Sequence, residues 1–161
     1  FPQGENIAHE SKFPAKRDFY SGLTHLLNTQ YKNTEHLVVM GDINVAAQDL
    51  DIGIGDDNRK RWLKSGKASF QPIERQWLSD LRQFGLTDSY RQLHPQVEDY
   101  SWFDYRSRGF EREPKRGLRI DQILLTNSLL DCCKTADVDY VIRGMEKPSD
   151  HCPIFVELAI D

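Results

Sequence analysis

The sequence predicts an α+β fold in which a mixed β-sheet is covered by helices on one face. Two amphipathic segments predict helices, and apolar runs between turn residues predict strands. The expected strands lie near residues 37–40, 100–105, 118–126, 138–143 and 154–160. A chain of 161 residues can bury one hydrophobic core, so a single domain is expected.

The first helix is predicted from about Pro14 to Tyr31, with a proline in its first turn. Its apolar stripe consists of Phe19, Leu23, Leu26 and Leu27. The second helix is predicted from about Pro72 to Phe84, where Gly85 provides a stop signal. The stretch 46–71 between them contains glycines but no strong period. It is predicted to be a functional surface loop.

The end of the first strand carries the most informative motif. Gly41 is followed at once by Asp42 and Asn44. Residues two apart on an extended chain point to the same side, so a carboxylate and a carboxamide share one face. That pair suits a hard divalent cation and a phosphate. A turn stabilised by the Asp and Asn side chains explains the same residues.

Asp150 and His151 precede the last strand and lie between Pro148 and Pro153, which exclude the pair from any helix. A carboxylate beside an imidazole could ligate a metal, or orient and protonate a phosphoryl oxygen. A loop histidine that is hydrogen-bonded to a carbonyl is the plainer interpretation. The pair alone does not decide between these interpretations.

Asp121 shares a strand face with Ile123 and Leu125, which predicts a carboxylate on the buried side. A buried charge is costly unless another group pairs with it. The sequence offers two kinds of partner for this carboxylate. One is an imidazole, and the other is the guanidinium of Arg119 on the same face.

Five segments together carry a family resemblance. They are Gly41–Asn44, Asn58–Leu63, Ser101–Arg106, Gly117–Asp121 and Met145–His151. The chain resembles the C-terminal part of an exonuclease III-type protein, an AP endonuclease and 3′-exonuclease of the DNase I-like endonuclease/exonuclease/phosphatase superfamily. The first and last segments are typical of the whole superfamily, and the Trp-Phe-Asp-Tyr-Arg and Gly-Leu-Arg-Ile-Asp segments narrow it to this branch. The loop Glu111–Arg116 looks longer than is usual there.

The resemblance implies part of a DNase I-like four-layer α/β sandwich, to which this chain supplies mainly the second mixed sheet with its outer helices. Phe1 matches a point well inside the family's domain. The family's N-terminal half, with a glutamate metal ligand and a catalytic tyrosine, has no counterpart here. Residues 1–161 are therefore expected to be a C-terminal portion. Self-association through an uncovered sheet face is expected as well.

The resemblance implies a Mg²⁺-dependent DNA-repair phosphodiesterase, for which Mn²⁺ could substitute. Its partner is double-stranded DNA, cleaved 5′ to abasic sites or trimmed at 3′ ends. One alternative is a catalytically incompetent half-domain that binds DNA or assembles with its missing half. Another is a superfamily phosphatase. Without a membrane-length apolar run or a cysteine motif, a cytoplasmic location with reduced thiols is expected.

The resemblance also implies the roles of the site residues. Asp42 handles a proton or faces the metal, Asn44 orients water or a phosphate oxygen, and His151 stabilises charge while Asp121 orients it. The implied catalytic residues are Asp42, Asn44, Asp121 and His151. The implied metal ligands are Asp42, Asn44, Asp150 and His151.

A net charge of −4 does not exclude DNA, because the basic residues are clustered. One cluster falls in residues 59–67 and another in residues 106–119. Each could also be an ordinary solvated face. Trp102 is expected either to pack in the core with Phe103 or to wall a pocket for a flipped-out abasic sugar. The predicted DNA contacts are Arg59, Lys60, Arg61, Trp102 and Arg106.

Overall fold

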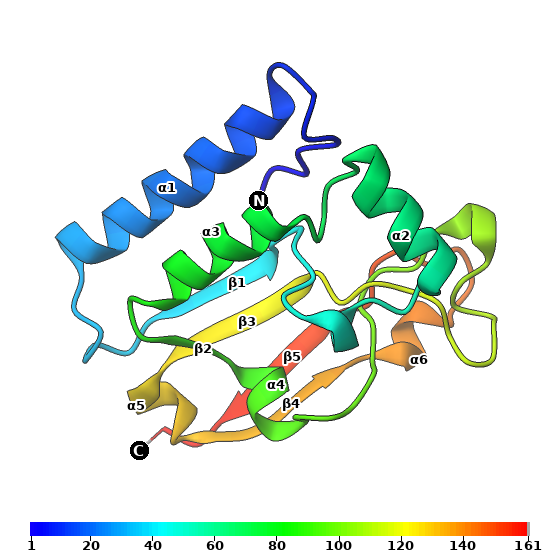
Figure 1. Ribbon diagram of the computed structural model, residues 1–161. Coiled ribbons are helices and arrows are strands. Elements are labelled where there is room, and N and C mark those ends of the chain that lie inside the picture. Colours follow the sequence, from blue (N-terminus) through cyan, green and yellow to red (C-terminus); the bar gives the residue numbers. More distant parts are fainter. Residues whose placement is uncertain (161) are drawn as a thin grey trace.

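In a computed structural model that describes residues 1–160, a layer of helices lies over antiparallel sheets (Figure 1). The strands are β1 (Val38–Asp42), β2 (Leu86–Asp88), β3 (Asp121–Thr126), β4 (Cys133–Val138) and β5 (Ile154–Leu158). The α-helices are α1 (Lys12–Gln30), α2 (Asp56–Ser65), α3 (Pro72–Arg82), α4 (Ser89–Leu93), α5 (Asn127–Leu130) and α6 (Tyr140–Arg143). Short 3₁₀ helices occupy Asp49–Asp51 and Tyr105–Ser107.

The strands form a three-stranded sheet in the order β1-β3-β2 and a separate β4-β5 pair. Every strand pair in residues 1–160 is antiparallel, whereas the sequence predicted a mixed sheet. All six residues of β3 are buried. A strand that is buried on both faces reads as a continuous apolar run, and such a run does not reveal the direction of its neighbours.

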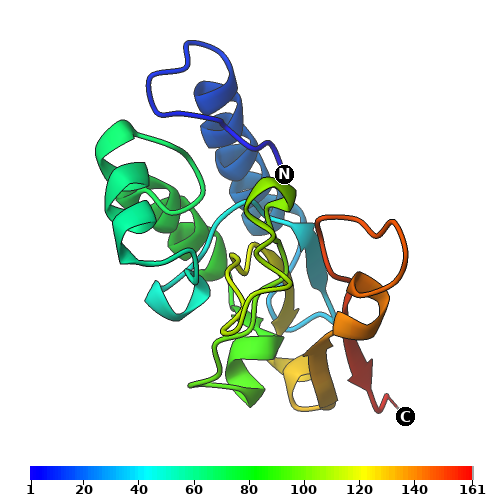
Figure 2. The ribbon, with the colours of Figure 1, turned by 90° about the vertical axis from the view of Figure 1, so that its right-hand side faces the viewer.

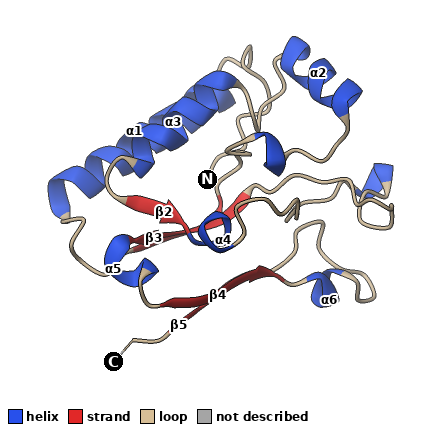
Figure 3. Ribbon diagram, turned by 60° about the horizontal axis from the view of Figure 1, so that its bottom comes forward, coloured by secondary structure: helices blue, strands red, loops and turns tan. Residues whose placement is uncertain are grey.

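Helices α1 and α3 cover one face of the three-stranded sheet (Figures 1 and 3). Their inward-facing side chains and strand residues form a core cluster that includes Tyr20, Leu27, Leu78, Leu81, Phe84, Leu86 and Leu124. Of the stripe predicted for the first helix, Leu27 is buried and Leu23 packs against the cluster, whereas Phe19 and Leu26 are 43% and 45% exposed. On the opposite face, Ile123 and Leu125 of β3 pack against side chains of β5. The two amphipathic helices that the sequence predicted are thus confirmed, with ends within two residues of the expected ones.

Two predicted strands are wrong. The strand expected at 138–143 lies earlier, as β4, and residues 140–143 form α6 because the Asp139 side chain accepts a hydrogen bond from the Ile142 amide. In residues 100–105, Trp102 forms isolated bridges with Leu118 and His151, and Tyr105 begins the second 3₁₀ helix. Their apolar character comes from packing in a loop, because Phe103 is fully buried without belonging to a strand.

The predicted loop 46–71 contains helix α2, which is a second correction. None of the α2 residues is buried, so no apolar stripe marks the helix in the sequence. Strand β2 and helix α4 were not predicted either, because segments of three and five residues are too short to show a period.

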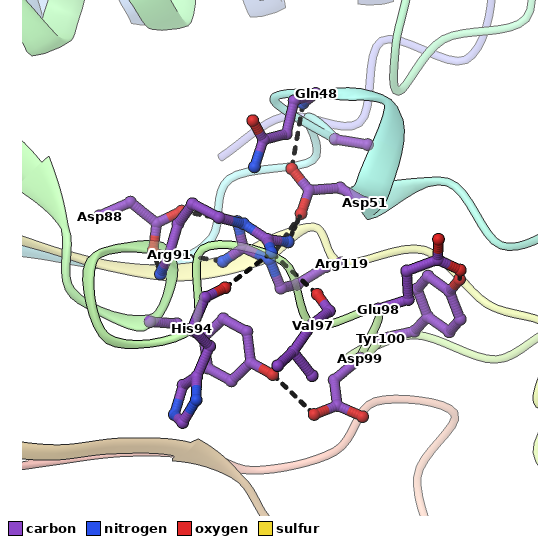
Figure 4. A network of polar contacts seen from close by, with 12 residues as sticks. Gln48, Asp51, Asp88, Arg91, His94, Val97, Glu98, Asp99, Tyr100 and Arg119 are labelled. Carbon is purple, nitrogen blue, oxygen red and sulfur yellow. Dashed lines mark hydrogen bonds and ion pairs between the residues drawn. The ribbon is translucent and has the colours of Figure 1, made fainter.

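A buried ionic network joins three segments of the chain (Figure 4). Arg119, only 1% exposed, donates to the carboxylates of Asp51 and Asp88. Asp51 also accepts hydrogen bonds from Arg91 Nη2 and from the Gln48 amide. The network therefore connects the first 3₁₀ helix, the start of α4 and the segment that leads into β3.

Apolar side chains of β1 remain exposed on the face that carries β5. Val38 and Met40 lie opposite Leu125 and Ile123, so all four share one face. The β3 residues are buried there, whereas Met40 is 59% exposed. No helix within residues 1–160 combines the length and the apolar character that crossing a bilayer requires. The three cysteines carry free thiols.

Replacing Arg119 by methionine should lower the free energy of unfolding by roughly 3–5 kcal/mol, because Asp88 would remain buried without its cation. Urea denaturation followed by circular dichroism measures the change. The control is Arg17→Ala, which removes an exposed ion pair with Asp18 and should change stability by less than about 0.5 kcal/mol. Equal effects of the two substitutions would contradict this role for the network.

Replacing Met40 by lysine should reduce self-association, because it places a charge in the exposed apolar face of β1. Light scattering over a concentration series compares the variant with the unaltered chain. The control, Met145→Lys, changes an equally exposed methionine outside the sheets. If the unaltered chain is a monomer at all concentrations, the expected self-association is wrong.

Candidate active site

A cavity of about 220 Å³ opens at the carboxyl end of β1. The polar residues that line it include Asp42, Asn44, Asp150 and His151, and the indole rings of Trp62 and Trp102 form part of its wall. These residues come from four separate parts of the chain. In Figure 2 the loop that carries His151 lies beside the end of β1. The structure therefore brings together the separate motifs that the sequence singled out.

Asp42 and Asp121 face each other because their strands pair antiparallel in this register. His151 lies between the two carboxylates. Its Nδ1 is 2.9 Å from Asp121 Oδ2, and its Nε2 is 4.0 Å from Asp42 Oδ2. The structure thus selects the imidazole as the partner of Asp121, while Arg119 pairs with Asp51 and Asp88 instead. Asp121 is placed to hold the ring so that Nε2 faces the cavity.

Asn44 adopts a left-handed backbone conformation with φ of 55°. Its backbone amide and its Nδ2 both donate to the Asp42 carboxylate at 2.9 Å. The motif therefore forms the turn that its residues favour and also places both side chains at the cavity. The two interpretations of the sequence are compatible.

Lys16 and Glu74 support this turn, and sequence analysis did not identify them. Both side chains are fully buried and form an ion pair. Lys16 Nζ also donates to the carbonyl oxygens of Asn44 and Gln3. Glu74 accepts from the amides of Ser69 and Gln71. From the sequence, a lysine in an amphipathic helix is expected to be exposed to solvent. Only the three-dimensional structure shows that Lys16 is buried and supports the turn at Asn44.

The pKa values of Asp42 and His151 are both raised, for different reasons. Burial raises the pKa of Asp42, and the neighbouring charge of Asp121 raises it further. Burial alone would lower the pKa of His151, but the hydrogen bond and the charge of Asp121 outweigh it and raise the pKa. The imidazole is therefore more easily protonated than a free histidine, and Asp42 is a stronger base than a free aspartate.

The donor set fits a hydrated Mg²⁺ better than a fully protein-ligated ion. Within residues 1–160, no group of three or more His, Cys, Asp or Glu side chains is placed to hold a metal. Magnesium is commonly bound by one or two carboxylates together with water and phosphate oxygens. Asp42 and Asp150 line the same cavity and could supply such oxygens. His151 fits this role poorly, because Nδ1 contacts Asp121 and a hard cation prefers oxygen.

Trp102 forms part of the cavity wall and donates from Nε1 to Asp150 Oδ2 at 2.9 Å. Its neighbour Phe103 is fully buried in the core. Trp102 also packs against the core cluster that contains Leu118 and Ile120, so it combines core packing with a place in the cavity wall, and its contact with an abasic sugar stays a prediction. The remaining apolar wall consists of Leu118 and Ile120.

Four of the five predicted DNA-contact residues lie on α2 and on the second 3₁₀ helix, and the fifth, Trp102, forms part of the cavity wall. Arg59 forms an ion pair with Asp49, so part of its charge is neutralised. Arg61 instead donates to the amide oxygen of Asn58, and Lys60 and Arg106 are exposed. The predicted residues thus share one region but differ in the charge that they present.

Comparison with known proteins relates the chain to one family. The model of the endonuclease/exonuclease/phosphatase family matches residues 4–151. The chain is 52% identical over 158 residues to exodeoxyribonuclease III of Haemophilus influenzae, covering 98% of this chain and 58% of that protein. The chain thus spans little more than half the length of this relative.

Solved structures are similar as well. An AP endonuclease from Archaeoglobus fulgidus superimposes with a TM-score of 0.87 at 31% identity, covering 99% of this chain and 59% of the other. A 3′ phosphatase from Neisseria bound to a product DNA hairpin gives 0.85 at 36% identity, covering 99% of this chain and 58% of the other. These likenesses confirm the predicted DNase I-like fold.

Removing the Asp121 charge should lower the pKa of His151. In metal-free buffer, Asp121→Asn is expected to shift the NMR titration of the His151 ring to lower pH, and the signal absent from His151→Gln identifies that ring. Because the folded pKa is raised, protonation of His151 stabilises the folded chain. That contribution is complete below about pH 6.5 and is lost as the pH rises through the folded pKa.

Urea denaturation as a function of pH checks the sign of this linkage. The stability difference between the unaltered chain and His151→Gln should shrink as the pH rises. Asp131→Asn, a substitution at an exposed carboxylate, serves as the control and should leave the titration of His151 in place. A stability difference that grows with pH would show that the imidazole is held neutral.

Proposed function

This chain belongs to the endonuclease/exonuclease/phosphatase family, and we propose that it is the C-terminal portion of a divalent-metal-dependent DNA-repair nuclease. The proposed protein cleaves phosphodiester bonds 5′ to abasic sites and trims 3′ ends of double-stranded DNA. The observation that supports this proposal best is the position of His151 between Asp42 and Asp121, at a cavity with indole rings in its wall.

Phosphodiester hydrolysis needs an activated water and stabilisation of the charge that develops on the phosphate. Asp42 accepts the proton of the attacking water, and Asn44 orients that water. The water oxygen bonds to phosphorus, the bond to the leaving 3′ oxygen breaks, and that oxygen takes a proton from solvent water. His151, held by Asp121, donates from Nε2 to a non-bridging oxygen. When bound, Mg²⁺ supplies Lewis-acid polarisation of the phosphate, and Asp42, Asn44 and Asp150 are the residues that would hold it.

The raised pKa values suit these roles. A base is most useful when its pKa lies closer to the working pH, which burial achieves for Asp42. A cation is most useful opposite a developing negative charge, which the pairing with Asp121 favours at His151. Asp42 and His151 thus face the same cavity in different proposed roles, Asp42 as a base and His151 as a cation.

The partner of this site is proposed to be duplex DNA with an abasic site or a 3′ end. Trp102, Leu118 and Ile120 provide an apolar surface beside the reacting groups, where a sugar that lacks its base would fit. The exposed basic residues Lys60, Arg61 and Arg106 would contact backbone phosphates. The names of the similar proteins, an exodeoxyribonuclease and an AP endonuclease, agree with this substrate class.

A second candidate is a half-domain that binds DNA without cleaving it. The lack of a three-ligand acidic or histidine cluster within residues 1–160 favours this possibility for the chain by itself. Mg²⁺ gives up its water reluctantly, so two carboxylates alone would hold it weakly. The nuclease and the non-cleaving half-domain would use the same surface to bind DNA, and only the nuclease would cleave it.

In a full-length protein that contains this chain, Asp42→Asn and His151→Ala should each lower cleavage of abasic duplex DNA at least about a hundredfold, the size expected for acid–base and phosphate-contact groups. Single-turnover assays in Mg²⁺ measure the rate. The control, Asp80→Asn, changes a carboxylate that hydrogen-bonds only to Gln76 and lies away from the cavity. A variant that keeps its rate would remove that residue from the mechanism.

A further inference from the structure

A second cavity of about 170 Å³ lies beside the proposed catalytic cavity, and the two share the side chains of Trp62 and Trp102. We propose that this second cavity binds a backbone phosphate of the DNA strand next to the nucleotide at the catalytic cavity. Arg61, Arg112 and Arg116 are the residues that would hold this phosphate. The inference rests on the proposed function and adds a binding site to it.

The charge of the second cavity favours an anion. Three guanidinium groups line it, and Asp104 contributes the single carboxylate of its lining. Within residues 1–160, none of these three arginines forms an ion pair. Five other arginines each pair with an aspartate, namely Arg17, Arg59, Arg75, Arg91 and Arg119. Like charges that face one cavity repel one another, and a bound phosphate would relieve that repulsion.

The loop that carries Arg112 and Arg116 is held closed by two hydrogen bonds within it, one from a backbone amide and one from a side chain. The Arg116 amide donates to the Gly109 carbonyl at 2.8 Å, and Arg112 Nε donates to the Ser107 carbonyl at 3.1 Å. A side chain at Gly109 would come within 2.0 Å of the Arg116 carbonyl oxygen, so the closed loop requires glycine there. This closure fixes the spacing of the two arginines before any ligand binds.

Arg61 reaches the same cavity from helix α2, where Asn58 orients it through a hydrogen bond of 2.6 Å from Nη2 to Oδ1. The cavity thus joins one member of the first basic cluster to two members of the second. Guanidinium groups present planar sets of donors that match phosphate oxygens, and they remain charged at any ordinary pH. Both properties identify phosphate as the chemical class of the ligand.

The position of the cavity favours a DNA phosphate over free phosphate. Its wall shares the side chains of Trp62 and Trp102 with the cavity that His151 lines, so a strand that occupies one cavity passes close to the other. Two of its three arginines lie in residues 111–116, the loop that looked longer than is usual in the resembling family. The site is therefore expected to be a feature of this chain.

The test compares DNA binding by the chain and by a variant that combines Arg112→Ala with Arg116→Ala. Both residues are exposed, so the fold should be unaffected. Fluorescence anisotropy with a duplex containing an abasic-site analogue, in EDTA, should show about ten- to thirtyfold weaker binding. The log–log salt slope should fall in magnitude by about 0.9, the value for one phosphate contact. The control combines Arg17→Ala with Lys32→Ala, which removes the same charge from the region of α1.

A second arm locates the phosphate. Each phosphate near the abasic site is replaced in turn by a neutral methylphosphonate, and affinities are measured for the chain and the double variant. At one position next to the abasic site, the methylphosphonate should weaken binding of the unaltered chain but not weaken binding of the double variant any further. Both changes remove the same contact, so their effects on the binding free energy do not add there. Additive effects at every position would overturn the proposal. Competition by millimolar inorganic phosphate without any sensitive position would indicate free phosphate as the ligand, and would overturn it as well.

The two proposals fail differently. If the unaltered chain binds no DNA, both the proposed function and this inference are contradicted. If the chain binds DNA while the double arginine variant keeps its affinity and its salt slope, only the phosphate site is wrong. A conservative variant, Arg112→Lys with Arg116→Lys, should bind DNA with an affinity between those of the unaltered chain and the double alanine variant. Lysine keeps the charge but loses the planar donor set.

Discussion

Arg119 is the residue on which the arrangement of this fold depends. A guanidinium that is 1% exposed is tolerated only when carboxylates pair with it, so Asp51 and Asp88 must approach the same point. These aspartates belong to the first 3₁₀ helix and to the end of β2. Their pairing therefore positions the segment that leads into β3, and with it Asp121, two residues farther along the chain.

The same rule of charge compensation shapes the candidate site. The β1–β3 register sets Asp42 opposite Asp121, and two facing carboxylates would repel each other without a cation between them. A protonated His151 would supply that cation at the wall of the cavity, and the fully buried Lys16 donates to the carbonyl of Asn44. Charged side chains at the site thus lie beside groups of opposite charge. The pKa values of Asp42 and His151 differ from those of free side chains because of these neighbours and of burial.

The sequence predicted the elements that carry a clear period and the residues that carry chemistry. Helices α1 and α3 were predicted from their amphipathic pattern, and two of the three polar motifs line one cavity, while Asp121 contacts His151 at its wall. Helix α2 could not be predicted, because none of its residues is buried. The role of Lys16 and Glu74 could not be predicted either. A buried ion pair between helices that are far apart in the sequence leaves no local sequence pattern. The partner of Asp121 was narrowed to two groups, and only the packing of Arg119 decided between them.

Ion pairs within the protein also determine which basic residues are available to bind DNA. The net charge is −4, so attraction to DNA must come from cations that the protein does not neutralise itself. Arg59 belongs to the predicted contact cluster, but Asp49 already shares its charge. Within residues 1–160, Arg61 forms no ion pair and donates to the neutral side-chain amide of Asn58, and it lines the same cavity as Arg112 and Arg116. A cluster that looks uniform in sequence is thus divided by the fold into arginines that support structure and arginines that remain available for phosphate.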